Sequence, residues 1–178
     1  ISISDRAFSH CSNLTSIAIP NSVISIGANA FSNCKSLTSI TIPNSVMSIG
    51  DGTFEDCTSL TSITIPNSVK SIGDNAFLGC KSLTSIIIPN SVKSIGDDSF
   101  YGCTSLMSIT LPNSLTTIAE GTLRECISLA SIKIPKSVIS IGKGAFEGTG
   151  YYNDYTNWKD GVLYLDNCLI SAKGIRSW

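Results

Sequence analysis

A repeat of 23 residues runs through most of this 178-residue chain and limits what the chain can fold into. A large apolar residue marks the period in seven units: Phe8, Phe31, Phe54, Phe77, Phe100, Leu123 and Phe146. A cysteine follows the same spacing at Cys11, Cys34, Cys57, Cys80, Cys103 and Cys126, as do all six prolines, at Pro20, Pro43, Pro66, Pro89, Pro112 and Pro135. Repeats of this length become stable by stacking on their neighbours. The period therefore predicts a solenoid with one coil per repeat.

Each repeat contains a short alternation of polar and apolar residues that predicts a strand. In Ser62-Ile63-Thr64-Ile65 the polar and apolar side chains alternate, which is typical of a strand with one buried face. Pro66 ends this strand because it has no N–H for a ladder, and Asn67 follows in a turn. Stacked coils then place these strands side by side in a parallel sheet.

The second half of the repeat predicts a return path without a regular strand. Val69 and Ile72 are three residues apart, which favours a bent or 3₁₀-like path, and Gly73 allows a tight corner. Asp74 is expected to N-cap one short helical turn that carries Phe77 inward. We therefore predict a right-handed α/β solenoid with a parallel β-sheet on one face and short helical or 3₁₀ turns opposite. Because Ser4 and Ala119 replace the corner glycine in two repeats, that corner should not require a positive φ.

The pattern Leu-x-x-Ile-x-Ile-Pro-x-x-Val-x-x-Ile-Gly-x-x-Ala-Phe-x-x-Cys resembles the 23-residue leucine-rich repeat of the BspA type, which is related to the treponemal class. The resemblance covers residues 1–149, which we expect to form six to seven coils, the first incomplete. It implies a leucine-rich-repeat solenoid of the kind found in surface proteins of anaerobic bacteria and some parasitic protists. It also implies a cell-surface or extracellular location and a role in adhesion to host proteins or other cells.

Residues 150–178 differ from the repeats and are expected to form a C-terminal cap. Six of the thirteen aromatic residues lie there: Tyr151, Tyr152, Tyr155, Trp158, Tyr164 and Trp178. The segment from Val162 to Leu165, the pair Asp166-Asn167 and the segment from Cys168 to Ile170 predict a β-hairpin. This region is interpreted as a cover for the last coil, and the alternative is an aromatic ligand site. No such cap precedes the first coil, so we expect possible end-to-end self-association there.

Nothing in the sequence predicts catalysis. His10 is the only histidine, and its equivalents in the other repeats vary, which indicates a solvated position. The cysteines, one per coil, are interpreted as a buried ladder of reduced thiols, with disulfides or metal binding as alternatives. A column of aspartates admits a calcium ladder, but capping of single helical turns is the preferred interpretation: Asp51, Asp74, Asp97 and Asp98. We therefore expect a protein that is not an enzyme and that has no cofactor and no metal site.

Composition narrows the class of partner. The formal net charge is −1, which argues against nucleic acid or a polybasic membrane contact. No apolar run is long enough to span a bilayer. The resemblance to BspA-type repeats implies a protein or glycan ligand on a host or neighbouring cell as the partner.

The outward face of the predicted sheet is the candidate binding surface. A serine column there is constant, whereas the columns beside it change from repeat to repeat. The residues predicted to bind are Thr41, Thr64, Ile87, Met107, Thr110 and Lys133. We expect a non-catalytic binding module. The alternatives are a structural spacer within a larger surface protein and, less favoured, an ice-binding lattice of Ser and Thr.

Overall fold

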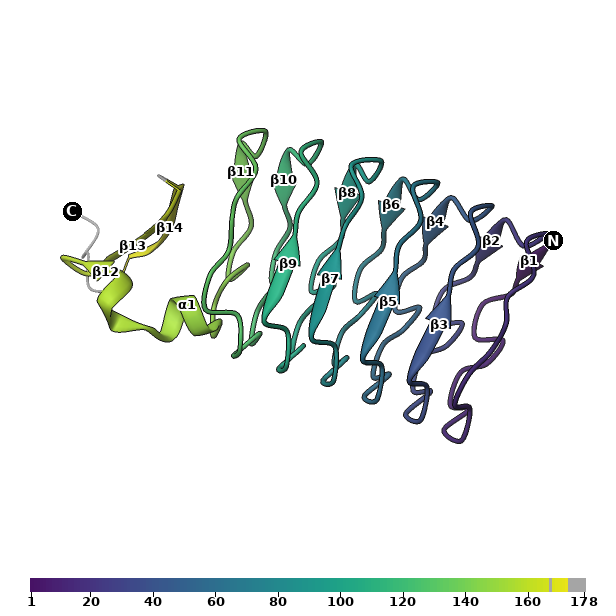
Figure 1. The fold of residues 1–178 in the computed structure, drawn as a ribbon. Helices are drawn as coiled ribbons and strands as arrows, with labels where there is room; N and C mark the ends of the chain where they lie inside the picture. The colour runs from purple at the N-terminus through teal and green to yellow at the C-terminus, as the bar shows by residue number, and fades with distance from the viewer. Residues whose placement is uncertain (167, 173–178) are drawn as a thin grey trace.

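The computed structural model describes residues 1–166 and 168–172 and shows a stack of similar coils (Figure 1). Backbone hydrogen bonds between equivalent residues of adjacent coils join the stack, as between the Lys93 N–H and the Lys70 carbonyl oxygen at 2.8 Å. The predicted solenoid is confirmed.

The predicted strands lie in one column, which we call the first ladder and which consists of two separately paired halves. Its members are β3 (Ser39–Thr41), β5 (Ser62–Thr64), β7 (Ser85–Ile87) and β9 (Ser108–Thr110). β3 pairs in parallel with β5, and β7 with β9, each with equivalent residues opposite one another. The middle isoleucine of each strand faces the interior and the flanking residues face solvent. Alternation in the sequence therefore located these four strands correctly, but the equivalent segment at residues 131–134 forms no strand and that at 16–19 only an isolated bridge at Ala18.

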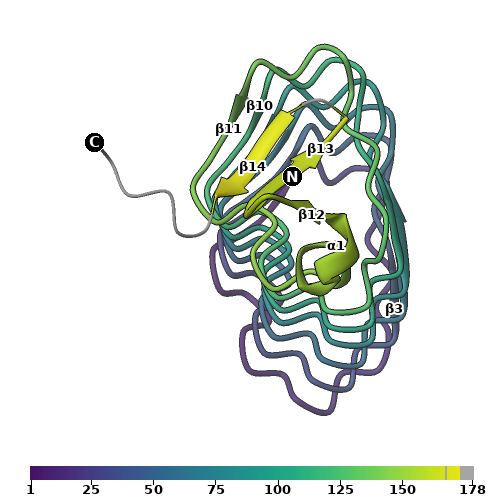
Figure 2. The same cartoon turned by 90° about the vertical axis from the view of Figure 1, so that its left-hand side faces the viewer.

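A second parallel ladder lies on the opposite side of each coil and corrects the prediction of a return path without strands. Its members are β1 (Ser2–Ile3), β2 (Ser25–Ile26), β4 (Ser48–Ile49), β6 (Ser71–Ile72), β8 (Ser94–Ile95), β10 (Thr117–Ile118) and β11 (Ser140–Ile141). The first five form one sheet, and β10 pairs with β11. Figure 2, which looks along the stack, shows β3 on one side of the coil and β10 and β11 on the other. Two-residue strands are too short to show an alternation in the sequence.

The expected helical turn is replaced by a chain of turns. The N–H groups of Leu78 and Cys80 bond to carbonyl oxygens three residues earlier, at 3.0 and 3.2 Å. The N–H groups of Phe77 and Gly79, which alternate with these two along the chain, instead bond to carbonyl oxygens of the next coil, both at 2.8 Å. Because every second donor leaves the coil, no helix forms within residues 1–149. Only the local three-residue bonds of a 3₁₀ turn are retained.

Positive φ angles recur twice per coil in these turns. In one coil, for example, Asn75 has φ +55° and Gly79 has φ +69°. The corner at Gly73 is not in this region, as predicted. Glycine is favoured at the corner because an added Cβ would lie 2.7 Å from the backbone nitrogen of Asp51 in the preceding coil.

The phenylalanines form a single column that is buried from Phe31 onward, with Phe8 partly buried. Adjacent ring centroids from Phe8 to Phe100 are separated by 5.2, 5.7, 5.4 and 5.2 Å. Leu123 and Phe146 continue the core with almost no exposed surface. The alignment predicted by the 23-residue period is confirmed.

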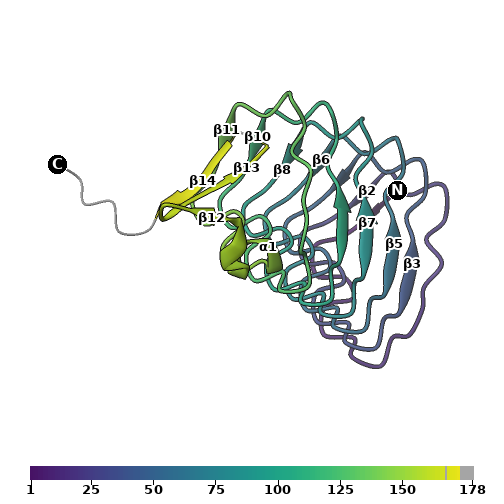
Figure 3. The ribbon, with the colours of Figure 1, turned by 60° about the vertical axis from the view of Figure 1, so that its left-hand side comes forward.

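A different structure follows the coils. It consists of α1 (Gly150–Asn153), the 3₁₀ helix η1 (Tyr155–Asn157), β12 (Trp158–Lys159), β13 (Val162–Leu165) and β14 (Cys168–Ala172). The predicted hairpin pairs Leu165 with Cys168, and β12 adds a third antiparallel strand that the sequence did not indicate. Asn167 of the predicted hairpin turn and Trp178 of the predicted cap lie outside the described residues. Figure 3 shows this small sheet at the end of the stack.

The C-terminal segment contacts the last coils directly. The Tyr151 N–H bonds to the Leu129 carbonyl oxygen at 2.9 Å, and the Ile134 N–H bonds to Asp166 Oδ2 at 3.0 Å. Leu163 and Leu165 of β13 are buried. In the described part of the chain, no helix has the length and apolarity needed to cross a membrane.

Candidate docking groove

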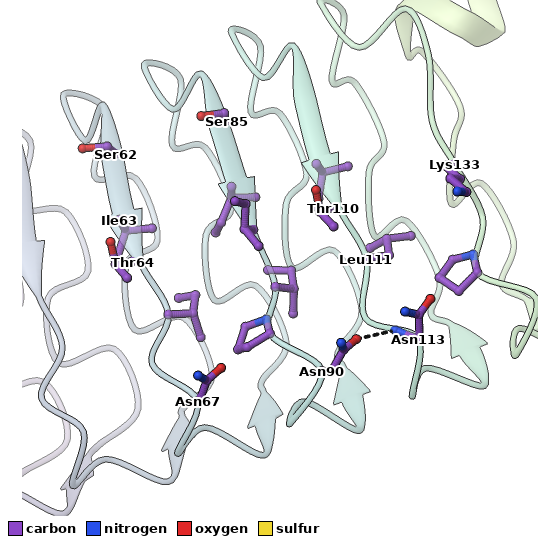
Figure 4. A pocket seen from close by; sticks show the side chains of 17 residues that line it. Ser62, Ile63, Thr64, Asn67, Ser85, Asn90, Thr110, Leu111, Asn113 and Lys133 are labelled. Carbon is purple, nitrogen blue, oxygen red and sulfur yellow. Dashed lines mark hydrogen bonds between the residues drawn. The ribbon is translucent and has the colours of Figure 1, made fainter.

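A hollow on the described surface lies over the first ladder. It encloses about 750 Å³ and takes its lining from four successive coils (Figure 4). Three kinds of residue form it: the outward Ser and Thr of the strands, buried aliphatic residues beneath them, and the Pro-Asn turns at one end. Lys133 is the one charged residue among those that line it. We call this hollow the docking groove.

Ile87 is the one exposed apolar residue among those that line the docking groove. It occupies the position that Thr64 and Thr110 fill in the neighbouring coils, and 71% of its surface is exposed. The groove coincides with an interruption of the first ladder, because β5 and β7 are not paired in one sheet. An exposed isoleucine among short hydroxyl residues provides the apolar contact that a protein partner can bury.

A row of asparagines borders the docking groove. Asn67, Asn90 and Asn113 lie at the end of successive coils, and the Asn113 N–H bonds to Asn90 Oδ1 at 2.8 Å. Figure 4 shows these three side chains in sequence along the groove. In the sequence, Pro-Asn was interpreted only as a turn signal, so this row was not predicted. The recurrence of Pro-Asn after five of the six predicted strands was the available clue.

The structure brings four of the six predicted binding residues together. Thr64, Ile87, Thr110 and Lys133 line the docking groove, although Lys133 lies outside any strand. Two lie outside it: Thr41, exposed at the end of β3, and Met107, which precedes β9 and is 62% exposed.

The cysteines form a hydrogen-bonded interior column. The thiols of Cys34, Cys57, Cys80, Cys103 and Cys126 each donate to the carbonyl oxygen of the phenylalanine 26 residues earlier, at 3.1–3.2 Å. Burial raises the pKa of Cys57 and of Cys126 to about 12. All seven cysteines are free, and Cys11 departs from the expected ladder because it is exposed.

The aspartate column stabilises neighbouring coils, which corrects the assignment of these residues as caps of helical turns in their own coil. Asp51 Oδ1 accepts from the Asp74 N–H at 3.0 Å, and Asp74 Oδ1 accepts from the Asp97 N–H at 2.9 Å. Asp97 in turn accepts from the Glu120 N–H at 3.0 Å. Within residues 1–166 and 168–172, no group of three or more His, Cys, Asp or Glu side chains is arranged to hold a metal ion. His10 is exposed, as expected.

Sequence and structure comparisons agree on the family. The chain matches the BspA type leucine-rich repeat region in six copies, over residues 1–86 and 47–169. It therefore belongs to the BspA-type leucine-rich repeat family. A comparison with curated proteins gives no match.

Two solved structures resemble the chain over most of its length. A leucine-rich repeat protein from Bacteroides ovatus is 38% identical with a TM-score of 0.79, over 84% of this chain and 45% of that protein. A leucine-rich repeat protein of T. pallidum is 36% identical with a TM-score of 0.80, over 83% of this chain and 69% of that one. The chain thus spans less than half of the Bacteroides protein. The pneumococcal vaccine antigen PcpA shares the fold at 23% identity, with a TM-score of 0.63, over 89% of this chain and 44% of that protein.

Proposed function

We propose that this chain is a non-catalytic binding module that attaches to a protein at a cell surface through the docking groove. The observation that carries the proposal is Ile87, an exposed aliphatic side chain that lines a hollow and nearly uncharged surface. Depletion of charge around an apolar centre, with hydrogen-bonding groups at the rim, is typical of protein–protein contacts. The rigid repeat holds these groups in place, which lowers the entropy cost of binding.

The lining favours a protein over a glycan as the partner. Sugar rings commonly stack on aromatic side chains, and the docking groove has none among its lining residues. Its donors and acceptors are instead the amides of Asn67, Asn90 and Asn113 and the hydroxyl groups of the strand residues. These groups suit the peptide groups and small polar side chains of a protein segment.

Three further expectations belong to the same proposal. Residues 1–149 form the binding solenoid, and residues 150–178 form a cap whose Leu163 and Leu165 are buried at the end of the stack. The module acts at the cell surface or outside the cell. The first coil, where Ile1 is 77% exposed, associates with another molecule end to end.

A double variant tests the docking groove. Ile87→Thr with Lys133→Thr gives both coils the residue that other coils carry at this position, so the fold should be retained. A matched control, Ile127→Thr with Lys143→Thr, makes the same chemical changes at exposed positions outside the groove. Binding is measured to a panel of immobilised extracellular-matrix proteins and to cultured cells.

We expect the groove variant to lose binding while the control retains it, with both melting at the wild-type temperature. Equal binding by the two variants and the wild type would contradict the proposal. Failure of the wild-type chain to bind any surface would favour the spacer alternative. Thermal hysteresis without binding would favour the ice-binding alternative.

A further inference from the structure

A second column of exposed side chains lies beside the second ladder. Each coil contributes the residue that immediately precedes its strand of that ladder. In four adjacent coils the column consists of Ile24, Met47, Lys70 and Lys93, which we call the apolar-lysine column. Ile24 is 58% and Met47 59% exposed, and both lysines are exposed. None of these residues lines the docking groove.

Backbone hydrogen bonds hold the apolar-lysine column in register. The Lys70 N–H bonds to the Met47 carbonyl oxygen at 2.7 Å, and the Lys93 N–H bonds to the Lys70 carbonyl oxygen at 2.8 Å. The adjoining strands β2, β4, β6 and β8 are members of one sheet. Since neighbouring strands are about 4.8 Å apart, the four side chains project from a rigid line.

The two lysines have no anionic partner within the described part of the chain. The ion pair found there joins Arg124 to Glu147 at 3.1 Å and involves neither lysine. Like charges on adjacent strands repel one another, so this pair gives the folded chain no stability of its own. An external carboxylate would relieve the repulsion.

The surroundings of the column restrict the direction from which an acidic partner approaches. Four residues further along each coil are Asp51, Asp74 and Asp97, whose Oδ1 atoms bond to the next coil. These carboxylates repel an acidic partner that approaches from that side of the column. On the other side are the uncharged asparagines of the Pro-Asn turns. The partner therefore crosses the column from the asparagine side.

We propose that the apolar-lysine column is a second docking surface, which binds an extended protein segment that combines aliphatic and acidic side chains. The aliphatic side chains cover Ile24 and Met47, and the carboxylates pair with Lys70 and Lys93. A membrane is a poorer fit, because two lysines are fewer than the basic clusters that bind anionic lipid. The formal net charge of −1 disfavours lipid as well.

Synthetic peptides provide the probe. A labelled twelve-residue peptide with four Glu and four Leu is titrated with the whole chain, beside a counterpart in which Lys replaces every Glu. We expect saturable, salt-sensitive binding of the acidic peptide alone. Lys70→Glu with Lys93→Glu should weaken it about tenfold or more, and Met47→Ser should weaken it to a smaller degree.

A matched control separates the column from general charge effects. Lys35→Glu with Lys81→Glu changes the net charge by the same amount at exposed positions of the turns and should leave binding unchanged. Ile87→Thr should also have no effect, because Ile87 belongs to the docking groove. Loss of binding with Ile87→Thr alone would place the peptide in that groove and overturn the second surface. Equal binding of the two peptides, no binding of either, or lysine-dependent binding to phosphatidylserine vesicles in place of the peptide would overturn it too.

Discussion

The thiol of Cys80 donates a hydrogen bond of 3.2 Å to the carbonyl oxygen of Phe54, 26 residues earlier in the preceding coil. The same pair of positions repeats along the stack, so each cysteine joins its coil to the one before it. Both residues are fully buried. The cysteine column therefore fastens neighbouring coils in a way that an apolar side chain of similar size does not.

Replacement of Cys80 tests this role. Cys80→Ala removes a packed sulfur and leaves the Phe54 carbonyl without this donor, so we expect the free energy of unfolding to fall by about 1–3 kcal/mol. Cys80→Ser retains a hydrogen-bond donor on a shorter side chain. Its free energy of unfolding should therefore lie between those of the wild type and Cys80→Ala. Denaturant titration measures the change. Cys11→Ala at an exposed cysteine is the control and should differ little from wild type.

High pH should destabilise the chain through the same thiols. Burial raises the pKa of Cys57 to about 12, from an ordinary value of 9.0. Above pH 9 the unfolded chain loses these protons while the folded chain keeps them, so the unfolded state binds fewer protons and stability falls as pH rises. Each such thiol contributes a slope of about 1.4 kcal/mol per pH unit.

We therefore expect stability to be nearly flat below about pH 8 and to decline steeply between pH 9 and 12. Denaturation midpoints across this range measure the effect, and Cys57→Ala with Cys126→Ala should make the decline shallower. An unchanged decline in that variant would assign the effect to other groups.

The phenylalanine column should tolerate leucine better than alanine. Leu123 occupies the column without exposed surface, so a coil can accommodate the smaller branched side chain. Phe77→Ala should cost about 3–5 kcal/mol because it leaves a cavity between two stacked rings. Phe77→Leu should cost distinctly less. Thermal and denaturant unfolding measure both variants, and equal losses would show that ring stacking rather than volume determines stability.

The second of the two positive-φ positions in each coil, which Gly102 occupies in its coil, should be stable only with residues that tolerate a positive φ. Gly102 has φ +68° with open space around it, and Asn33 adopts φ +60° at the equivalent position. Gly102→Asn should therefore be nearly neutral, whereas Gly102→Val should cost about 1–2 kcal/mol through backbone strain alone. The free energies of unfolding of the two variants test this. A neutral valine would mean that the turn can change its conformation.

The aspartate column should depend on its oxygen acceptor more than on its charge. Asp97→Ala removes the acceptor of the Glu120 N–H and should cost about 0.5–1.5 kcal/mol. Asp97→Asn keeps that acceptor and should cost less. Burial, followed by the charge of Asp97, raises the pKa of Asp98, so the asparagine variant should also lower the Asp98 pKa. NMR titration of the Asp98 carboxyl group follows this shift, and an unchanged pKa would contradict the assigned contribution of Asp97.

Several features could be read from the sequence because a period specifies them directly. The 23-residue spacing aligns equivalent residues of stacked coils, so it predicted the phenylalanine column and the core. Two-residue alternation predicted the first ladder, and Asp166-Asn167 between two apolar segments predicted the hairpin. The alternation and the turn each lie within a few residues, and the period appears on aligning successive repeats.

The tertiary structure decided whatever depends on contacts between coils. The two-residue strands of the second ladder exist through pairing with adjacent coils, and Asp74 bonds to the next coil instead of capping a helical turn. The docking groove requires the interruption between β5 and β7 and the nearby row of asparagines. The repeat thus determined which residues share a column. Hydrogen bonding between neighbouring coils decided the structural role of each column. Those bonds join residues 22 to 26 positions apart and therefore leave no local pattern in the sequence.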